Sequence, residues 1–574
     1  MTDSLALYST WLAGSGPGPV DIPAVEDTVV RSLAALARQR AVCRNPNRAT
    51  DRVLTDVLLQ AQGTAFARAH NLDRVHDLAG FRAAVPIRDY DGLRPYIDRI
   101  VSGERHVLTR DDPYALVATS GTSGRRKLIP TTRHWRDQYR GAALYAQWGL
   151  YFQRLGWTSA TAGTVLDLSW ERTATSSDSG SLPIYSITKR PASVGPDDWT
   201  PFWYDEPWFI HEGHGYSGGF YEKLRLVASQ DIRLVVAVNP SRITALAEQL
   251  NDGYDQLLQD LMDGTLDGRP SEWTHPDPVT AGRLFTAKRF HGRLRLPDLW
   301  PNLSLLVCWN SASARYYRGW LEQVAPGVPL IPFSTTGSEG IVTIPVDTHA
   351  SAGPVALDQG IFEFVPCDEA DDGLPLATHT HTLMPWEVQT GQCYRLVMTQ
   401  ANGLYRYDVG DLYRVVGWVG LSPRLEFLGR AGTVSSFTGE KITEADVHAA
   451  VRAALQESSA FGELFSLVPV WKQPPGYELV IEQATGSDRS AAELAAGVER
   501  ELCRVNSEYA EKRDTQRLAA VRVRPVPLGT FAGLADDRVS GGASASQIKH
   551  HWLQQDSTLL DHLDTIVPFR QEQP

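Results

Sequence analysis

Apolar side chains in the N-terminal part of the chain recur every three or four positions, which is the repeat of a helix with one buried face. The first such positions are Val29, Leu33, Leu36 and Ala37. This pattern predicts helical structure from Pro23 to about Arg68. Pro46 predicts an interruption, because proline lacks the backbone donor of a helix interior. Pro86 and residues 88–90 then end the pattern.

Short β-prone runs follow, and several of them lead directly into helical patterns. The run Tyr114–Thr119 enters a glycine-rich loop and then a predicted helix from about Arg133 to Arg154. Residues 160–220 are rich in Trp, Ser, Gly and Pro, which indicates irregular structure with short strands.

Two further runs, Ile232–Val238 and Leu303–Trp309, each precede a helical pattern, at Pro240–Leu250 and Ala314–Val324. Alternation of short buried strands with helices predicts an α/β sheet. A β-rich region is expected from Ile361 to Phe427.

The pattern changes near residues 428–432, where we place a domain boundary. Thr443 and Asp446 have the spacing of a capping box for a helix through Ala454. The remaining predicted elements are strands at Leu464–Val470, Glu478–Ile481 and Leu518–Val523 and a helix at Ala491–Asn506. We therefore expect a large N-terminal part, residues 1–428, and a compact C-terminal α/β domain, residues 429–574.

Composition narrows the class of protein. Hydrophobic residues make up 43% of the 574 residues and charged residues 21%, which excludes general disorder. The 55 basic and 67 acidic side chains leave a formal charge of −12, so we expect no nucleic-acid partner, because phosphate neutralisation needs clustered cations. No apolar run approaches the ~18 residues of a membrane span.

The cysteines and the N-terminus indicate the compartment. The five cysteines are widely spaced and form no CxxC motif, which argues against disulfide frameworks and thiolate zinc sites. The first residues lack the basic start of a signal peptide. We expect a cytoplasmic protein that is a monomer or a weak homodimer.

The first candidate site is the segment Thr119–Lys127. Its loop combines hydroxyl side chains with two glycines, namely Ser120, Gly121, Thr122, Ser123 and Gly124. Glycines allow close approach of the backbone to a ligand, and successive N–H groups can surround phosphate oxygens. Lys127 adds positive charge, although the spacing is not that of a Walker loop. The alternative is a plain surface turn.

Two acidic motifs follow. In the segment from Phe333, Glu339 stands after a predicted strand beside Thr336, Gly337 and Ser338. Such a carboxylate can ligate Mg²⁺ together with phosphates, or it can be a solvated loop residue. In the segment Gly403–Asp411, Asp411 can accept hydrogen bonds from ribose hydroxyls, unless the segment is an ordinary hairpin.

The order of the three motifs resembles the auxin-responsive Gretchen Hagen family of acyl acid amido synthetases, which belongs to the adenylate-forming superfamily. Further segments support the resemblance from about Arg38 to Trp552: residues 64–104, 362–366, 439–444 and 542–549. The resemblance implies an α/β fold with a large multi-subdomain adenylating region that includes a β-rich part, and a small mobile C-terminal lid. It also suggests a bacterial member that acts in specialised metabolism.

The resemblance implies an ATP- and Mg²⁺-dependent acyl acid–amine ligase. A carboxylic acid reacts with ATP to give an acyl-adenylate and pyrophosphate, and an amine or amino acid then displaces AMP to give an amide. Residues 120–124 and Lys127 would bind phosphate, with Thr336, Gly337 and Ser338 beside them. Glu339 would ligate magnesium, Asp411 would hold ribose, and Lys549 would approach the acyl carboxylate and α-phosphate.

The remaining assignments also follow from motif order. Tyr407, Phe427 and Arg430 are candidate nucleotide contacts, with core packing as the alternative for Phe427. Candidate acyl-substrate residues are Trp135, Tyr139, Leu166, Trp170, Trp309, Asn310 and Ser311. Most aromatic residues of this kind simply belong to the core.

The chain departs from the family pattern at two positions. Thr335 stands where the family usually has an aromatic residue against adenine, and Asp408 stands where a basic or neutral residue is common. We expect Asp408 to alter contact with the mobile domain. The sequence leaves two alternatives open: an acyl-CoA ligase or carrier-protein loader on the same fold, and a nucleotide-binding protein without catalysis.

Overall fold

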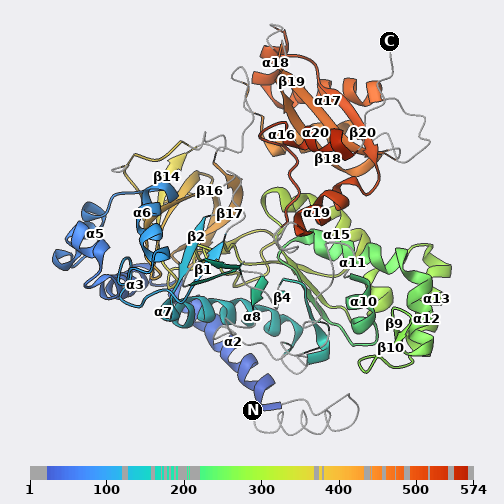
Figure 1. Cartoon of the computed structure of the whole chain (residues 1–574), viewed down its shortest axis with the longest axis horizontal. Helices are drawn as coiled ribbons and strands as arrows, with labels where there is room; N and C mark the ends of the chain where they lie inside the picture. Colours follow the sequence, from blue (N-terminus) through green and yellow to red (C-terminus); the bar gives the residue numbers. More distant parts are fainter. Residues whose placement is uncertain are drawn as a thin grey trace. The chain divides into compact units, whose positions relative to one another are not determined.

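The computed structural model divides the chain into two compact units (Figure 1). The first is formed mainly by residues up to Leu428 and the second mainly by residues from Gly429 onward. The structure describes the following residues: 22–118, 127–156, 162–169, 171–173, 177–179, 182–185, 189–191, 203, 206, 208, 220–367, 374–377, 380–431, 440, 442–455, 461–471, 474–483, 491–514, 518–540 and 548–566. In this part of the chain no helix is long and apolar enough to cross a bilayer.

A four-stranded parallel sheet lies at the centre of the first unit. Its order is β12 (Leu330–Pro332), β11 (Leu305–Cys308), β8 (Leu234–Val236) and β3 (Val165–Asp167). Apart from Asp167 at the end of β3, the strands are continuous apolar runs, as expected where both faces of a parallel sheet are covered. The predicted strands at 232–238 and 303–309 are confirmed, although each is shorter than its apolar run.

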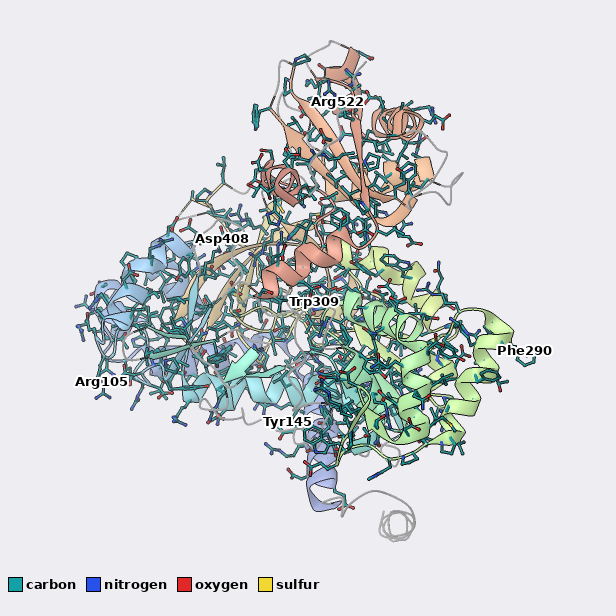
Figure 2. The ribbon with its side chains drawn as sticks, turned by 45° about the vertical axis from the view of Figure 1, so that its right-hand side comes forward. Arg105, Tyr145, Phe290, Trp309, Asp408 and Arg522 are labelled. Atoms are coloured by element: carbon teal, nitrogen blue, oxygen red, sulfur yellow. The ribbon has the colours of Figure 1, made fainter. Side chains whose placement is uncertain are left out.

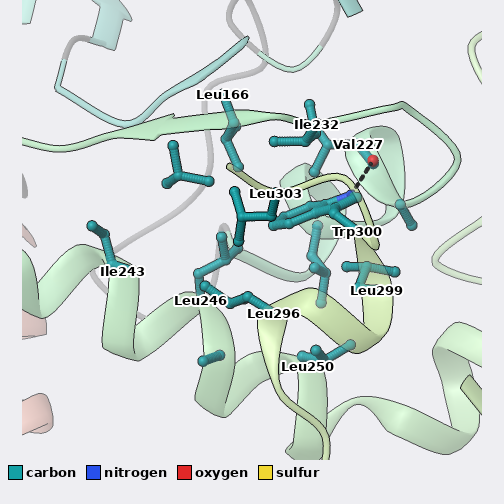
Figure 3. Close-up of a cluster of buried hydrophobic side chains, with 14 of the residues drawn as sticks. Leu166, Val227, Ile232, Ile243, Leu246, Leu250, Leu296, Leu299, Trp300 and Leu303 are labelled. Atoms are coloured by element: carbon teal, nitrogen blue, oxygen red, sulfur yellow. Dashed lines mark hydrogen bonds between the residues drawn. The ribbon is translucent and has the colours of Figure 1, made fainter. Parts of the chain in front are cut away.

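Helices cover both faces of this sheet. On one face, alternate strand residues such as Val235 and Leu306 pack with α11 (Pro240–Asp252) and α15 (Arg318–Val324). Figure 3 shows this cluster around Trp300, whose indole N–H donates to the carbonyl of Val227 (3.1 Å). On the other face, Val236 and its neighbours pack with α8 (Gly141–Leu155) and α2 (Ile22–Val42).

Helix α2 crosses α8 at very short range. Val29 and Leu36 of α2 are buried as predicted, but Ala37 is exposed, and Ser32 completes the buried side instead. At the crossing, a Cβ added to Gly149 of α8 would overlap the Ser32 carbonyl oxygen and lie 2.8 Å from Leu36 Cβ. Glycine is therefore required there by packing rather than by backbone conformation.

The predicted helix at 133–154 contains a π-helical turn. It begins as α7 (Arg133–Trp135), continues as the π turn η2 (Arg136–Arg140) and becomes α8. The N–H of Trp135 is capped by the Thr132 hydroxyl (3.1 Å). A π turn inserts one residue, so the side chains before and after it are out of α-helical phase.

Two further sheets of four and five strands belong to the first unit. One has the order β2 (Leu128–Thr131), β1 (Ala115–Ala118), β6 (Leu182–Tyr185) and β5 (Ser177–Ser179). The other has the order β13 (Gly353–Pro354), β17 (Ser422–Arg430), β16 (Leu404–Val419), β15 (Cys393–Gln400) and β14 (Ile361–Cys367). This second sheet is the predicted β-rich region, and its register shows antiparallel pairing of β14 with β15 and of β15 with β16.

The other elements of the first unit are helices and two two-stranded sheets, β9 (Thr265–Leu266) with β10 (Arg269–Pro270) and β4 (Glu171–Thr173) with β7 (Lys189–Pro191). The N-terminal helices are α3 (Pro46–Ala61), α4 (Ala65–His70), η1 (Leu72–Arg74), α5 (Leu78–Ala84) and α6 (Tyr90–Val101). The later helices are η4 (Ala162–Thr164), α10 (Phe220–Ala228), α12 (Tyr254–Asp263), α13 (Pro278–His291), α14 (Leu296–Leu299) and η6 (Ala312–Tyr317). The predicted interruption at Pro46 is confirmed, since α2 ends at Val42 and Pro46 is the first residue of α3.

The second unit is a three-stranded sheet with helices. Its strands, in the order β18 (Phe461–Val470), β19 (Gly476–Gln483) and β20 (Arg522–Pro527), pair first antiparallel and then parallel. The helices are α16 (Glu444–Leu455), α17 (Ala491–Val505), α18 (Ser507–Asp514), α19 (Thr530–Ser540) and α20 (Thr558–Ile566). The capping box is confirmed, since Thr443 Oγ1 and Asp446 Oδ2 accept from each other's backbone N–H (3.2 and 3.0 Å). The strand expected at 518–523 is wrong by several residues, because pairing with β19 begins at Arg522.

The close crossing of α2 and α8 predicts the effect of one methyl group. Gly149→Ala should lower the free energy of unfolding by about 1–3 kcal/mol, because an overpacked contact forces the backbone apart. Urea unfolding followed by circular dichroism measures this change. Gly282→Ala in α13 is the matched control, since nothing lies within 4 Å of its added Cβ, and it should stabilise the helix slightly. Equal effects of the two variants would contradict the packing argument.

Candidate functional site

The ends of the glycine-rich loop lie together. Residues 120–124 are outside the described part of the chain, but β1 ends at Ala118 and β2 begins at Leu128, and these two residues pair antiparallel. Lys127 therefore stands at the mouth of a hairpin loop. Its ammonium lies 5.8 Å from the centroid of the Tyr90 ring, and the Tyr90 hydroxyl accepts from the N–H of Leu128 (2.7 Å).

Residues 82–90 hold this hairpin beside the third motif. Arg88 forms an isolated parallel bridge with Tyr407 of β16. Its N–H donates to the carbonyl of Arg406 (3.2 Å), and its carbonyl accepts from the N–H of Asp408 (2.9 Å). Tyr90 and Tyr407 belong to the same buried cluster. Lys127 and the motif on β16 are thus joined through Tyr90.

A buried ion pair fixes this arrangement. The Arg406 guanidinium donates to both carboxylate oxygens of Glu363 (2.9 and 2.8 Å) and to the carbonyls of Arg82 and Val85 (both 2.9 Å). Arg406 also has a positive φ of 44°, an uncommon backbone conformation for a residue with a side chain. The pair ties β16 to β14 and to the segment that follows α5.

Asp408 has a structural role within its own sheet, and its expected effect on contact with the mobile domain stays a prediction. It is buried, and Arg395 of the neighbouring strand donates to both of its oxygens (3.0 and 2.6 Å). The Gly410 N–H also donates to Asp408 Oδ1 (3.0 Å). In contrast, Asp411 is only partly buried and is the acidic side chain of this motif that a ligand can reach. Asp408 is labelled in Figure 2.

The three other candidate nucleotide contacts differ in exposure. Tyr407 is fully buried in the core, which restricts it to packing in this structure. Phe427 is partly buried, with its ring 5.5 Å from that of Tyr413. Arg430 is partly exposed at the end of β17, and the contact division places it in the second unit.

The segment after β12 forms a tight turn that carries Glu339. The N–H of Gly337 donates to the carbonyl of Gly340 (2.9 Å), and the N–H of Val342 donates to that of Thr335 (2.9 Å). Glu339 is 5% exposed. A Cβ added to Gly337 would lie only 2.6 Å from Glu339 Oε2, so the carboxylate rests directly against the glycine. Any larger residue at 337 would displace it.

This turn fits a magnesium ion that is shared with a phosphate ligand. Mg²⁺ prefers oxygen donors, and Thr336 and Ser338 are further hydroxyl residues of the same turn as Glu339. Among the described residues there is no group of three or more His, Cys, Asp or Glu side chains that could enclose a metal ion. One carboxylate with phosphate and water oxygens is the usual ligand set of Mg²⁺ in nucleotide sites.

The candidate acyl-substrate residues lie in different surroundings. Leu166 has no exposed surface and belongs to the core in Figure 3, so in this structure it packs rather than lines a pocket. Trp170 is outside the described residues. Trp135 is 2% exposed, and its indole N–H donates to Gln400 Oε1 (3.2 Å). The Tyr139 hydroxyl donates to Asp56 Oδ2 (2.5 Å).

The turn after β11 lies at the carboxyl edge of the parallel sheet, where α/β proteins commonly bind ligands. Trp309, labelled in Figure 2, donates its indole N–H to the carbonyl of Ser334 (3.0 Å), which links this turn to the Glu339 segment. The Asn310 amide donates to the carbonyl of Ala350, while its Oδ1 is buried without a hydrogen bond from the described residues. Ser311 precedes η6 and is partly buried.

Sequence reasoning missed two buried polar residues at strand ends. Asp167 ends β3 and accepts from the N–H of Ser169 (2.8 Å); burial raises its pKa to about 6. Gln400 ends β15 and is 1% exposed. A polar residue at the end of a buried strand was the available signal for both.

In the second unit, Lys549 is exposed on a segment that is itself anchored. The N–H of Leu467 donates to the carbonyl of Trp552 (2.9 Å), and that of Gln554 donates to the carbonyl of Leu467 (2.8 Å). Desolvation lowers the pKa of His550 to about 4, so this imidazole stays neutral at pH 7 and bonds the carbonyl of Phe465 (2.7 Å).

The chain matches one family along most of its length. Models described as the GH3 family N-terminal, central and C-terminal domains match residues 35–330, 353–430 and 445–558. The indole-3-acetic acid-amido synthetase GH3.4 of Arabidopsis thaliana is 26% identical over 566 residues, with 92% of each chain covered. The indole-3-acetic acid-amido synthetase GH3.8 of Oryza sativa subsp. indica is 27% identical over 551 residues, with 88% of each chain covered.

A solved structure shares the fold. That of the GH3.15 acyl acid amido synthetase superposes with a TM-score of 0.76 at 22% identity, covering 93% of this chain and 95% of that chain. The same protein in complex with 2,4-DB gives a TM-score of 0.73 at 21% identity, covering 93% and 96%. The likeness confirms the predicted α/β architecture.

The helix that carries Trp135 predicts a pH effect on stability. His134 Nε2 donates to Asp56 Oδ2 (2.7 Å), and this hydrogen bond to a carboxylate raises the pKa of His134. Burial alone would raise the pKa of Asp56, but the hydrogen bonds from His134 and Tyr139 outweigh burial and lower it. The His134 contribution is therefore complete below its unfolded pKa of about 6.5 and is lost as pH rises through its folded pKa.

We expect His134→Gln to cost about 1 kcal/mol or more of unfolding free energy at pH 5.5, and less at pH 9. Urea unfolding of both proteins at the two pH values measures the difference. His76→Gln is the control, because His76 is exposed and no hydrogen bond from it occurs in the described structure. A His134→Gln effect that grows with rising pH would contradict this assignment.

Proposed function

The chain belongs to the GH3 family, and on this premise we propose that it is an ATP-dependent acyl acid–amine ligase. It converts a carboxylic acid and ATP into an acyl-adenylate and pyrophosphate. An amine or amino acid then attacks the adenylate carbonyl, the bond to the AMP oxygen breaks, and an amide and AMP leave. The relatives are named as amido synthetases, which supports an amine rather than a thiol as the acceptor.

The observation that carries this proposal is the position of Glu339. Its carboxylate is held against Gly337 in a turn after a parallel strand, and Trp309 links that turn to the neighbouring strand end. A buried carboxylate at this edge of the sheet suits a metal ion that bridges to phosphates. The burial of Glu339 argues against the alternative of a solvated loop carboxylate.

The first half-reaction brings two anions together. The substrate carboxylate must approach the α-phosphorus of a triphosphate, and charge repulsion opposes this approach. Magnesium, when bound at Glu339, supplies positive charge at the phosphates. Lys127 and the backbone N–H groups of residues 120–124 would bind the remaining phosphate oxygens, and Asp411 would orient the ribose. Holding both reactants in line removes much of the entropic barrier.

We assign the second unit the role of a mobile lid. Lys549 is exposed on its surface, so a change in orientation of the unit would bring the ammonium to the reacting carboxylate and then withdraw it. A lysine suits this task because it is a compact charge on a flexible stem. Closure would also exclude water, which otherwise hydrolyses the adenylate.

Acid-dependent exchange of pyrophosphate into ATP tests the first half-reaction. A panel of small aromatic and aliphatic acids should contain at least one that supports exchange by the unsubstituted protein. With that acid, Glu339→Ala and Lys549→Ala should each lower the exchange rate by about 100-fold or more. The first variant loses the ligand of the magnesium ion, and the second loses a positive charge near the α-phosphate. Glu272→Ala and Lys288→Ala are controls with the same charge changes at positions outside the site, and both should retain full exchange.

The exchange experiment distinguishes an error in the proposed activity from an error in the assignment of residues. Lack of exchange with every acid of a broad panel would refute the ligase proposal itself. Exchange that survives Glu339→Ala and Lys549→Ala would leave the activity standing and refute the assignment of these residues.

The acceptor is tested by the product. With the active acid, ATP and a mixture of amino acids, mass spectrometry should show a new amide whose mass is that of acid plus amine minus water. Coenzyme A offered in place of the amines should give at most a trace of thioester. A thioester formed faster than any amide would assign the protein to the acyl-CoA ligases instead.

A further inference from the structure

Gln400 contacts several segments that carry residues of the candidate site. It is the last residue of β15, and its carbonyl accepts from the N–H of Gly403 (3.2 Å) in the turn that leads into the third motif. It pairs with Leu404, the first residue of β16. Its side chain is 1% exposed and points away from this turn to other segments.

The Gln400 side chain is packed between two glycines. A Cβ added to Gly340 would lie 2.8 Å from Gln400 Cδ and 3.0 Å from both Nε2 and Oε1. A Cβ added to Gly360, which precedes β14, would overlap the Gln400 amide nitrogen and lie 3.1 Å from Cδ. Gly340 directly follows Glu339, so the amide group of Gln400 forms the surface on which the Glu339 turn rests.

Trp135 sets the orientation of this amide. Its indole N–H donates to Gln400 Oε1 (3.2 Å), and therefore Oε1 faces the helix that follows the glycine-rich loop. The opposite atom, Nε2, is buried and has no hydrogen-bond acceptor among the described residues. An unpaired buried donor costs about 1–3 kcal/mol, so stability alone would not favour glutamine here.

We propose that Gln400 is a positioning residue for the metal-binding turn: its amide, oriented by Trp135, holds the backbone at Gly340 so that Glu339 presents its carboxylate to the nucleotide-bound metal ion. This proposal rests on the proposed function, because it assumes that Glu339 ligates the metal. Residues that support a metal ligand without touching the metal typically change its affinity by about 10–100-fold.

A methionine at position 400 separates positioning from stability. Gln400→Met keeps the length and approximate volume but lacks the amide. It removes one unpaired donor and leaves the Trp135 N–H unpaired instead, so the unfolding temperature should change little. The apparent dissociation constant for Mn²⁺, measured by electron paramagnetic resonance with a non-hydrolysable ATP analogue present, should rise about tenfold. Gln60→Met is the matched control, since Gln60 is also buried, with an unpaired Oε1, and lies on α3.

Each outcome of this experiment decides something. Unchanged Mn²⁺ affinity in Gln400→Met, while Glu339→Ala abolishes binding, would overturn the positioning role and leave the proposed function standing. A similar loss in Gln60→Met would show a general packing effect and also overturn it. Absence of nucleotide-dependent Mn²⁺ binding in the unsubstituted protein would refute the proposed function and this proposal together.

The role of Trp135 provides a second measurement, in which the first variant leaves Gln400 unchanged. Trp135→Phe removes the indole N–H and keeps an aromatic ring, so Gln400 loses its orienting bond. We expect Mn²⁺ affinity to fall in the same direction as in Gln400→Met, and the double variant to be no weaker than the worse single variant. Full additivity, or unchanged affinity in Trp135→Phe, would contradict orientation by Trp135.

Discussion

The buried pair of Arg406 and Glu363 is the interaction on which the arrangement of the first unit depends. A charge removed from water must be paired, and breaking such a pair costs about 3–5 kcal/mol. Arg406 is paired with Glu363, and its Nη1 also donates hydrogen bonds to the carbonyls of Arg82 and Val85. The segment after α5 is consequently bound to β16, which brings Tyr90 and then Lys127 to the strand that carries Asp411. Motifs separated by almost three hundred residues in the sequence share one location because this pair holds them.

Local sequence patterns predicted those helices and strands whose conformation depends mainly on residues within the same segment. The strands around 232–238 and 303–309 and the capping box of Thr443 and Asp446 were found because apolar runs and cap spacing are local signals. The start of β20 was missed, since pairing with β19 and not the apolar run at 518–521 determines it. Helices α10, α12 and α13 were not predicted. The hydrophobic face of α13 is weak, with only Thr280, Ala281 and Leu284 buried, so periodicity gives little signal there.

The candidate site shows the same division between local and long-range information. The sequence indicated Lys127, Glu339 and Asp411, because hydroxyl-rich and glycine-rich segments with charged ends are recognisable without a structure. It did not reveal that Asp408 pairs with Arg395 on another strand, and it passed over Gln400, whose partners come from three separate segments. Within the third motif most side chains support the fold, and few remain for chemistry. A motif therefore identifies a region reliably, while the assignment of each residue within it requires knowledge of what that residue packs against.

The π turn at Arg136–Arg140 has a consequence for how this chain can change over evolutionary time. The shift in phase lets the two ends of one helix face different partners, which a regular α-helix of the same length could not do. Trp135 before the turn contacts Gln400, and α8 after the turn packs on the parallel sheet. Loss of a single residue here would restore regular α-helical phase and rotate one side of the helix by about 100° relative to the other. The length of this helix is therefore constrained as well as its buried side chains. Among homologues, an insertion or deletion at this point should mark a lineage in which the connection between helix and nucleotide site was rebuilt.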